Sequence, residues 1–208
     1  DPVRYLGNHS SGRQGVAVAL AAADRGADVH LVAAHVDEGV LDAAARHPRI
    51  HLERVSTALD LGAAMTAVAA EMDVIVMVAA VGDFRMPEVT DEKIRKEDTG
   101  DTVTLTLTTN PDVLAGLVAT RRPGQTVVGF AAETANDHAE LLERGRRKRA
   151  RKSVDLLAVN LVGGGHGFGS ESNRLVIVDA RDTVLGDISG TKRETADAVW
   201  DAVRQARE

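Results

Sequence analysis

The chain has 208 residues, no cysteine and a formal net charge of −6, which excludes disulfides, thiolate metal sites and an enzyme-borne cysteine nucleophile. Its hydrophobic content of 44% allows a full core, whereas an aromatic content of 2% disfavours stacking on single-stranded nucleic acid. No apolar run approaches the ~20 residues that cross a bilayer and no signal peptide is visible, so we expect a cytoplasmic protein with no membrane partner. Because the first residue is Asp1, we expect the chain to be part of a longer polypeptide.

The first half of the chain alternates between apolar runs and helical patterns. Strands are predicted over 3–6, 29–34, 50–55 and 73–81, and helices over 16–25, 37–46 and from an N-cap at Ser56 to Met72. The run at 73–81 is continuously apolar, which is typical of a parallel strand that is covered on both faces. This order predicts an α/β fold with a doubly wound, mostly parallel, Rossmann-like sheet.

The pattern changes at Gly82, where a long polar segment runs to Asp101. Residues 103–109 then alternate strictly and predict a half-exposed strand, which would form an extra antiparallel strand or hairpin. Asn110 is the predicted N-cap of the next helix, with Pro111 at its first position. Further strands are predicted over 126–131, 156–161 and 175–178, further helices over 135–152 and 191–208, and a Gly- and Ser-rich loop over 163–173. Without an internal repeat or a linker, we predict one domain over 1–208.

The loop at 7–15 lies between a predicted strand and a predicted helix, where a doubly wound sheet binds phosphate through backbone N–H groups. It is not a P-loop, because Arg13 and Gln14 stand in place of the Lys and Ser/Thr of such a loop. A turn with a helix cap would account for the glycines alone. The adjacent polar side chains of Asn8, Ser10 and Ser11 favour a ligand site.

Two charged residues follow the predicted strand at 73–81. Asp83 comes at its carboxyl end, where open α/β sheets form ligand crevices, and a carboxylate there suits Mg²⁺. A solvated loop acid is equally compatible with this position. Lys93 lies ten residues further on in the polar segment, where an exposed charge is the alternative to a functional one.

A second concentration of charge lies at 144–152, where seven of nine residues are Lys or Arg. In a chain of negative net charge, such a cluster indicates a polyanionic partner. Lys148 and Lys152 are spaced i,i+4 and share one helix face, which is able to hold a triphosphate. A solvated basic helix or an RNA-contact segment are the alternatives, and overall acidity argues against a nucleic-acid partner.

A series of short motifs runs along almost the whole chain. They are DPVRY at 1–5, NHSSG at 8–12, AAVGDFR at 79–85, KIRK at 93–96, NPDVL at 110–114, VGFAAET at 128–134, KRARK at 148–152 and GFGSESN at 167–173, with Asp155 and Asn160 between the last two. In this order they resemble phosphopantothenate–cysteine ligase, the synthetase half of the bacterial bifunctional decarboxylase/synthetase of coenzyme A biosynthesis. The departures are small: Gly82 stands where Ala is usual, and Phe84 where Tyr or Phe occurs.

The resemblance implies a reaction of 4′-phosphopantothenate, CTP and L-cysteine that gives phosphopantothenoylcysteine, CMP and diphosphate through an acyl-cytidylate. It implies Mg²⁺ or Mn²⁺ as the cofactor. It also implies a homodimer through this domain, a higher oligomer in the full-length chain, and a flavin-dependent decarboxylase preceding it.

The resemblance further assigns residues to roles. Asn8 would convert the acyl-cytidylate, Lys93 would act in its formation, Ala79 would belong to the same catalytic set, and Asp83 would lie by the metal. Substrate would contact Asn8, Ser10, Ser11 and Gly12. CTP would contact Met77, Val78, Ala79, Asp83, Lys93, Pro111, Asp112, Val113, Leu114, Phe130, Lys148 and Lys152.

Two other function classes stay open on the residues alone. A doubly wound sheet with a polar loop also suits a dinucleotide-binding oxidoreductase, although Tyr5 is the one tyrosine and position 9 is His rather than the Lys of short-chain enzymes. A nucleic-acid-binding protein would use the basic cluster at 144–152.

Overall fold

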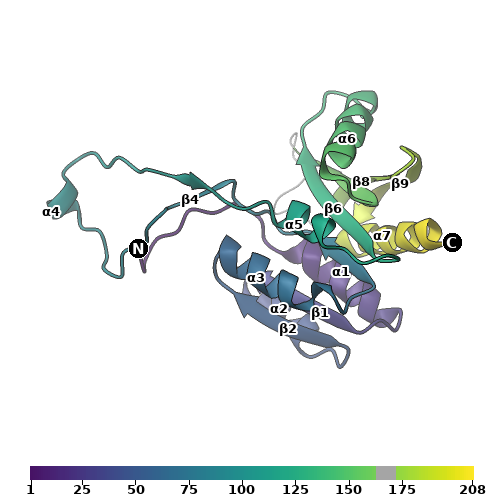
Figure 1. Cartoon of the computed structure of the whole chain (residues 1–208), viewed down its shortest axis with the longest axis horizontal. Coiled ribbons are helices and arrows are strands. Elements are labelled where there is room, and N and C mark those ends of the chain that lie inside the picture. Colours follow the sequence, from purple (N-terminus) through teal and green to yellow (C-terminus); the bar gives the residue numbers. More distant parts are fainter. Residues whose placement is uncertain (163–171) are drawn as a thin grey trace.

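A computed structural model describes residues 1–162 and 172–208 (Figure 1). Its main sheet has five strands in the order β3 (Val74–Met77), β6 (Thr126–Glu133), β7 (Leu156–Leu161), β8 (Ser172–Asp179) and β9 (Val184–Thr191). The first three are parallel, and β8 and β9 are antiparallel to their neighbours. A separate parallel pair is formed by β1 (Val29–Ala34) and β2 (Ile50–Val55), and a short antiparallel pair by β4 (Phe84–Arg85) and β5 (Thr108–Thr109).

Helices cover both faces of the main sheet, as the doubly wound prediction requires. Helices α5 (Val113–Ala119) and α6 (His138–Lys152) lie on one face, and α1 (Arg13–Asp24) and α7 (Lys192–Arg207) lie on the other. The other helices of the described residues are α2 (Glu38–Ala45), α3 (Ala58–Ala69) and α4 (Lys96–Thr99). Successive side chains of a strand point to opposite faces. Val127 therefore packs in the cluster beneath α5 and α6, whereas Val128 packs against α7.

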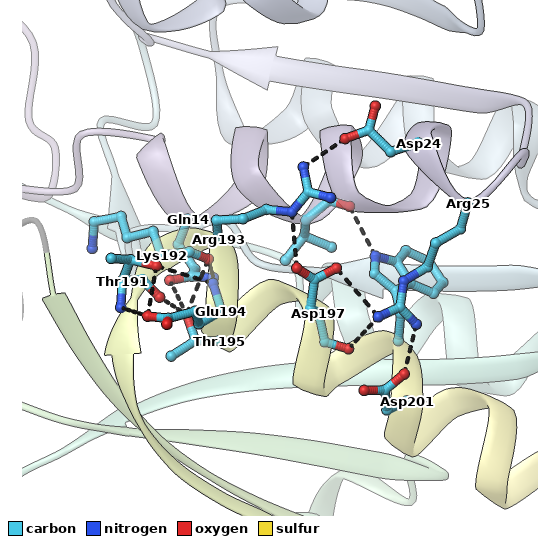
Figure 2. Close-up of polar contacts among 12 residues, drawn as sticks. Gln14, Asp24, Arg25, Thr191, Lys192, Arg193, Glu194, Thr195, Asp197 and Asp201 are labelled. Atoms are coloured by element: carbon cyan, nitrogen blue, oxygen red, sulfur yellow. Dashed lines mark hydrogen bonds and ion pairs between the residues drawn. The ribbon is translucent and has the colours of Figure 1, made fainter.

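Helices α1 and α7 lie side by side on one face and are joined by polar contacts (Figure 2). Arg193 pairs with Asp24 of α1, and Arg25 pairs with Asp197 and Asp201 of α7. The Trp200 indole N–H donates to the Val18 carbonyl at 2.9 Å. A capping box of Thr191 and Glu194 fixes where α7 begins. The ion pairs thus join the carboxyl end of α1 to the first half of α7.

A long arm, residues 82–112, leaves the sheet after β3 and returns to α5 (Figure 1). It contains β4, β5 and α4, and the amino-terminal residues run beside it. The Asp1 carboxylate accepts from the Ile94 N–H, and the Arg4 guanidinium donates to the Ile94 carbonyl at 2.7 Å. Apolar side chains along the arm and the amino terminus are largely exposed, namely Val3, Tyr5, Leu6, Phe84, Val89, Val103, Leu105 and Leu107.

Several element boundaries differ from the sequence predictions. Residues 3–6 form no strand, because they pass along the arm where no described strand borders them. β3 ends at Met77 rather than at Val81, because Val81 N–H turns back to the Ala79 carbonyl. Of the alternating run at 103–109, only Thr108–Thr109 is a strand, since the strand opposite it, β4, is only two residues long.

The predicted caps at Ser56 and Asn110 are also wrong, each by one or two residues. Thr57 caps α3 in a capping box with Asp60. Asp112 caps α5, while the Asn110 amide instead donates to the Gly82 carbonyl at 2.8 Å and closes the base of the arm. Strand β9 was not predicted. The predicted loop at 163–173 falls outside the described residues except for its last two, which begin β8.

Gly145, in the middle of α6, is required by packing. It is buried in α6, and a Cβ there would lie 2.7 Å from a methyl of Val159. We expect Gly145→Ala to destabilise the fold by about 1–3 kcal/mol, although alanine is the better helix former. Gly116→Ala in α5 is the matched control, because its Cβ would meet no heavy atom within 4 Å, and it should stabilise by up to about 1 kcal/mol. Chemical unfolding of both variants measures the two changes in the free energy of unfolding. Equal changes would contradict the prediction.

In the described part of the chain, no helix combines the length and the apolar character needed to cross a membrane.

Candidate functional site

The carboxyl end of β3 meets the loop before α1. The Asn8 amide donates to the Ala80 carbonyl at 2.7 Å, so the polar loop at 7–15 is fastened to the segment that follows β3. Met77 is buried and pairs with Gly129 of β6, which leaves mainly its backbone for any ligand. Ala79 and Ala80 are exposed. The structure thus brings together Asn8 and the strand end at 77–79, two of the predicted site segments.

The amino terminus of α1 lies within the same loop. Gly12 is its N-cap, with φ of 75°, and a Cβ at this residue would lie 2.5 Å from a Val36 methyl. Glycine is therefore required both for its backbone conformation and for the close approach of the loop. Within the described part of the chain, no side chain caps this end of α1. The N–H groups of the first turn are left for a ligand such as a phosphate. Ser10 and Ser11 directly precede this turn.

Gln14 links this helix end to α7 and β8. Its amide donates to the Lys192 carbonyl at 3.3 Å and accepts from Asn173 at 3.1 Å and from Thr195 at 3.3 Å. Burial lowers the pKa of the Lys192 ammonium, and the nearby Arg13 lowers it further. Sequence reasoning used Gln14 only to reject a P-loop. Its role in fixing α1 was not foreseeable, because the partners are about 160–180 residues away in sequence.

On the other face, two predicted nucleotide-binding lysines of α6 reach the carboxyl end of β6 and the start of α5. Lys148 pairs with Glu133 at 2.7 Å, and Lys152 pairs with Asp112. Partial burial raises the pKa of Asp112, but the ammonium of Lys152 and the Ala115 N–H outweigh it and the net shift is downward. Both lysines are thus held by carboxylates that a more highly charged anion would have to displace. Glu133 was missed as a site residue, although it lies in the motif at 128–134.

Two arginines of the basic cluster are also paired with carboxylates of the chain, and a third donates to a backbone carbonyl. Arg144 pairs with Glu140 at 2.6 Å. Arg149 pairs with Asp182 at 3.4 Å, and Arg146 donates to the Asp182 carbonyl. Because these cations already have partners, the charge that remains available on α6 is much smaller than the sequence indicates. This weakens the case for a nucleic-acid surface.

The predicted nucleotide residues divide between the two faces of the sheet. Phe130 packs on the face of α1 and α7, near Val18 and Val78. Val113 and Leu114 pack on the opposite face. Leu114 lies against Gly129, where an added Cβ would be 3.0 Å from a methyl of Leu114. Pro111 precedes the helix cap and is exposed. The two groups meet β6 on its opposite faces at neighbouring residues, Gly129 and Phe130.

Asp83 lies at the base of the arm with an exposed side chain. Its backbone carbonyl accepts from the Asn110 N–H at 2.8 Å, which fixes the position of the residue. Among residues 1–162 and 172–208, no three His, Asp or Glu side chains cluster as a metal site. One carboxylate fits an ion such as Mg²⁺ that takes most of its ligands from water and substrate phosphates.

Lys93 is not brought to the other site residues. It adjoins Ile94, which contacts Asp1, and the amino terminus lies well out along the arm (Figure 1). Asn8, by contrast, lies where the arm leaves the sheet. Within one chain, the two residues predicted for the two chemical steps are therefore apart.

The ion pair of Asp112 gives a pH prediction. A carboxylate whose pKa is lowered by folding stabilises the native state above its unfolded pKa, ordinarily 3.8, and this contribution is lost as the pH falls through the lower folded value. Asp112→Asn keeps a capping side chain but loses the ion pair with Lys152. We expect it to destabilise by no more than about 1 kcal/mol near neutral pH, because the pair is partly exposed. Thermal unfolding of the wild type and the variant should show that their difference in stability shrinks below pH 3.8. A difference that stays constant with pH would contradict the prediction.

Comparison with known proteins places the chain in a family. The family model described as "DNA/pantothenate metabolism flavoprotein C-terminal domain" matches residues 1–206. The coenzyme A biosynthesis bifunctional protein CoaBC of Mycobacterium bovis is 43% identical over 98% of this chain and 48% of its own length. CoaBC of Escherichia coli K12 is 42% identical over 84% of this chain and 41% of its own length. The chain thus spans about half the length of these curated relatives.

Solved structures share the fold. The crystal structure of the C-terminal domain of CoaBC matches 99% of this chain and 87% of its own, with a TM-score of 0.75 and 25% identity. A Cab2 variant in complex with phosphopantothenate-cysteine matches 98% of this chain and 80% of its own, with a TM-score of 0.70 and 16% identity. At that identity the second likeness concerns the fold alone. The family match extends over nearly every residue, so the chain belongs to the DNA/pantothenate metabolism flavoprotein C-terminal domain family.

Proposed function

We propose that this chain ligates 4′-phosphopantothenate to L-cysteine at the expense of CTP, as a ligase of coenzyme A biosynthesis acting in the cytoplasm. The observation that carries the proposal is the Asn8 amide bound to the Ala80 carbonyl beside the uncapped amino terminus of α1. A phosphorylated acid bound there would contact a polar side chain, free N–H donors and the end of a parallel strand. The curated relatives are coenzyme A biosynthesis proteins, and this supports the same reading.

In the first step, a carboxylate oxygen of phosphopantothenate attacks the α-phosphorus of CTP. The bond from that phosphorus to the bridging oxygen breaks, and diphosphate leaves. In the second step, the cysteine amine attacks the acyl carbonyl, loses a proton, and expels CMP. No enzyme nucleophile is required, in keeping with a chain that has no cysteine.

The first step gathers negative charge on diphosphate, so cations should accelerate it. Lys148 and Lys152 would exchange Glu133 and Asp112 for phosphate oxygens, and the start of α5 would offer further N–H donors. Asp83 is the residue we assign to hold Mg²⁺ together with the triphosphate, where the ion would neutralise charge on the leaving group. Lys93 is the cation we assign to the reacting phosphoryl group.

The second step requires an acyl carbonyl that is held and polarised. The Asn8 amide has N–H donors for this purpose, and one of them already binds a backbone carbonyl at the end of β3. The amide has a second N–H, which would donate to the acyl carbonyl of the intermediate while the bond to Ala80 holds the loop in place. We therefore assign Asn8 to aminolysis rather than to activation.

A homodimer is part of the proposal, and the arm is its proposed interface. Val103, Leu105 and Leu107 alternate along an extended segment and so share one face, and all three are exposed. An apolar face of this kind on a protruding segment needs a partner. A second copy would cover it and would bring the arm, with Lys93, toward a site other than that of its own chain.

Sedimentation tests this interface with matched leucines. Leu105→Glu should shift the chain to monomer, whereas Leu59→Glu on α3, similarly exposed at 47% against 55%, should not. A wild-type chain that is monomeric at all concentrations would remove the homodimer from the proposal.

The test of the proposed function is diphosphate release with Mg²⁺ and 4′-phosphopantothenate, comparing CTP with ATP, each with and without L-cysteine. CTP-selective release that depends on phosphopantothenate would establish activation, and cysteine-dependent turnover would establish ligation. Absence of release in every combination, from a chain that is folded, would overturn the proposal.

A further inference from the structure

Lys192, the first residue of α7, is a cation without a counter-ion. Among residues 1–162 and 172–208, no carboxylate forms an ion pair with its ammonium, and its side chain is only partly exposed. The next residue differs, because Arg193 pairs with both Asp24 and Asp197. Figure 2 shows the Lys192 side chain extending past this network without a polar contact of its own. The charge of Lys192 is therefore not used to hold α7 in place.

Three features of the surroundings disfavour the positive charge of Lys192. Burial removes water from the ammonium, and the nearby Arg13 guanidinium repels it. The position at the amino terminus of α7 adds the positive end of a helix dipole, where cations are destabilising. A neutral side chain would suit the unliganded fold better. A charge that is kept where the fold disfavours it is typical of a functional site.

The groups near Lys192 share a need for an anion. The Gln14 amide in the first turn of α1 donates to the Lys192 carbonyl, so the starts of α1 and α7 adjoin. The N–H groups of that first turn have no side-chain cap in the described chain. The Arg13 guanidinium is exposed, and no carboxylate of the described residues pairs with it. One anion bound here would stabilise two cations and the free N–H donors together.

A buried acceptor beside the same helix start is independent evidence for a ligand. Asn173 is 5% exposed, and its amide N–H donates to Gln14 at 3.1 Å. Gln14 in turn donates to the Lys192 carbonyl, so the orientation of both amides is fixed by this chain of hydrogen bonds. The Asn173 Oδ1 then has no hydrogen-bond partner within the described chain. Because an unmet buried acceptor costs free energy, this position indicates a ligand that brings a donor as well as an anion.

We propose that Lys192 binds the phosphate group of 4′-phosphopantothenate and selects this substrate over pantothenate, which lacks the phosphate. The inference rests on the proposed function, whose site at the start of α1 it extends to α7. A phosphate monoester carries close to two negative charges at neutral pH, enough to compensate both Lys192 and Arg13. The same substrate has a free hydroxyl, which is a donor of the kind that the Asn173 acceptor lacks.

Steady-state kinetics of Lys192→Gln tests the contact. The KM for 4′-phosphopantothenate should rise about 10- to 100-fold, the usual cost of losing one hydrogen bond to a charged group. The kcat and the KM for CTP should stay near their wild-type values, because the phosphate is remote from the reacting carboxylate and is bound alike before and during the reaction. Lys192→Arg keeps the charge and should restore most of the affinity. Arg204→Gln is the matched control, since it removes an exposed cation from the last turn of the same helix.

Thermal unfolding without ligand separates binding from a structural role. Lys192→Gln should melt at a temperature no lower than the wild type, because it removes a charge that the unliganded fold disfavours. A lysine that served only to hold α7 in place would lower the melting temperature when replaced.

Three outcomes in a chain with an active wild type would overturn the inference and leave the proposed function in place. The first is a KM for 4′-phosphopantothenate within twofold of wild type in Lys192→Gln. The second is a fall in kcat together with a lower melting temperature, because Lys192 would then be structural. The third is an equal rise of this KM in Arg204→Gln, because the net charge alone would then be responsible. A folded wild type that releases no diphosphate would instead overturn the proposed function, and the inference with it.

Discussion

Replacement of Lys93 by glutamine is expected to slow CTP-dependent diphosphate release by about 10²- to 10³-fold, the usual cost of losing one group that stabilises developing charge. The substitution keeps a polar side chain that is one bond shorter, and it removes the charge. Because Lys93 is exposed and lies on the arm, the change should leave the melting temperature unaltered. Single-turnover release of diphosphate, with phosphopantothenate present and cysteine absent, isolates the step concerned.

Arg46→Gln is the matched control, since it removes an exposed cation from the end of α2, far in sequence from every assigned site residue. It should release diphosphate at the wild-type rate. Release at that rate from Lys93→Gln as well would remove Lys93 from the activation step, and nothing else in the proposal would change.

The position of Lys93 adds a second measurement. Lys93 and Asn8 are apart within one chain, whereas the proposed homodimer would unite the arm of one copy with the site of the other. Mixing a Lys93→Gln chain with an Asn8→Asp chain should then restore ligation, because each dimer with one chain of either kind contains one intact site. No recovery, from chains shown to exchange subunits, would mean that the arm serves its own chain.

The sheet was largely predictable from sequence because its strands are short apolar runs between clear helix signals. The limits of β1, β2 and β7 agree with those predicted, since pairing and burial in these strands follow directly from composition. The arm was not predictable in the same way. Strict alternation at 103–109 indicates an extended chain with one apolar face, but it does not say whether a strand lies opposite.

The candidate functional site was likewise predictable only in part. The loop at 7–15 and the carboxyl end of the strand at 73–81 were each predicted as ligand segments of a doubly wound sheet, and in the structure the Asn8 amide joins them. The pairing of Lys148 and Lys152 with Glu133 and Asp112 could not be foreseen, since it depends on where α6 crosses β6 and α5. A basic cluster in sequence therefore proved to be mostly compensated charge in the fold.

The second large effect is expected for Asn8→Asp, which should uncouple the two chemical steps. A carboxylate has no N–H to offer, so the bond to the Ala80 carbonyl is lost and two oxygens face each other. The same loss removes the donor that would polarise the acyl carbonyl during aminolysis. We expect one diphosphate to be released per active site, followed by a stall, with overall ligation slowed by at least about 10²-fold.

Two measurements distinguish a stall before aminolysis from the effect of a misfolded loop. The stalled variant should retain labelled CMP and phosphopantothenate in equal amounts after gel filtration, as the bound acyl-cytidylate. Asn8→Ala also lacks the donor but introduces no negative charge, and should stall in the same way if the missing N–H is the cause. Should only the aspartate variant stall, repulsion by its charge would be the cause, and the assignment of Asn8 to aminolysis would be wrong. Product formation at the wild-type rate in both variants would remove Asn8 from the chemistry altogether.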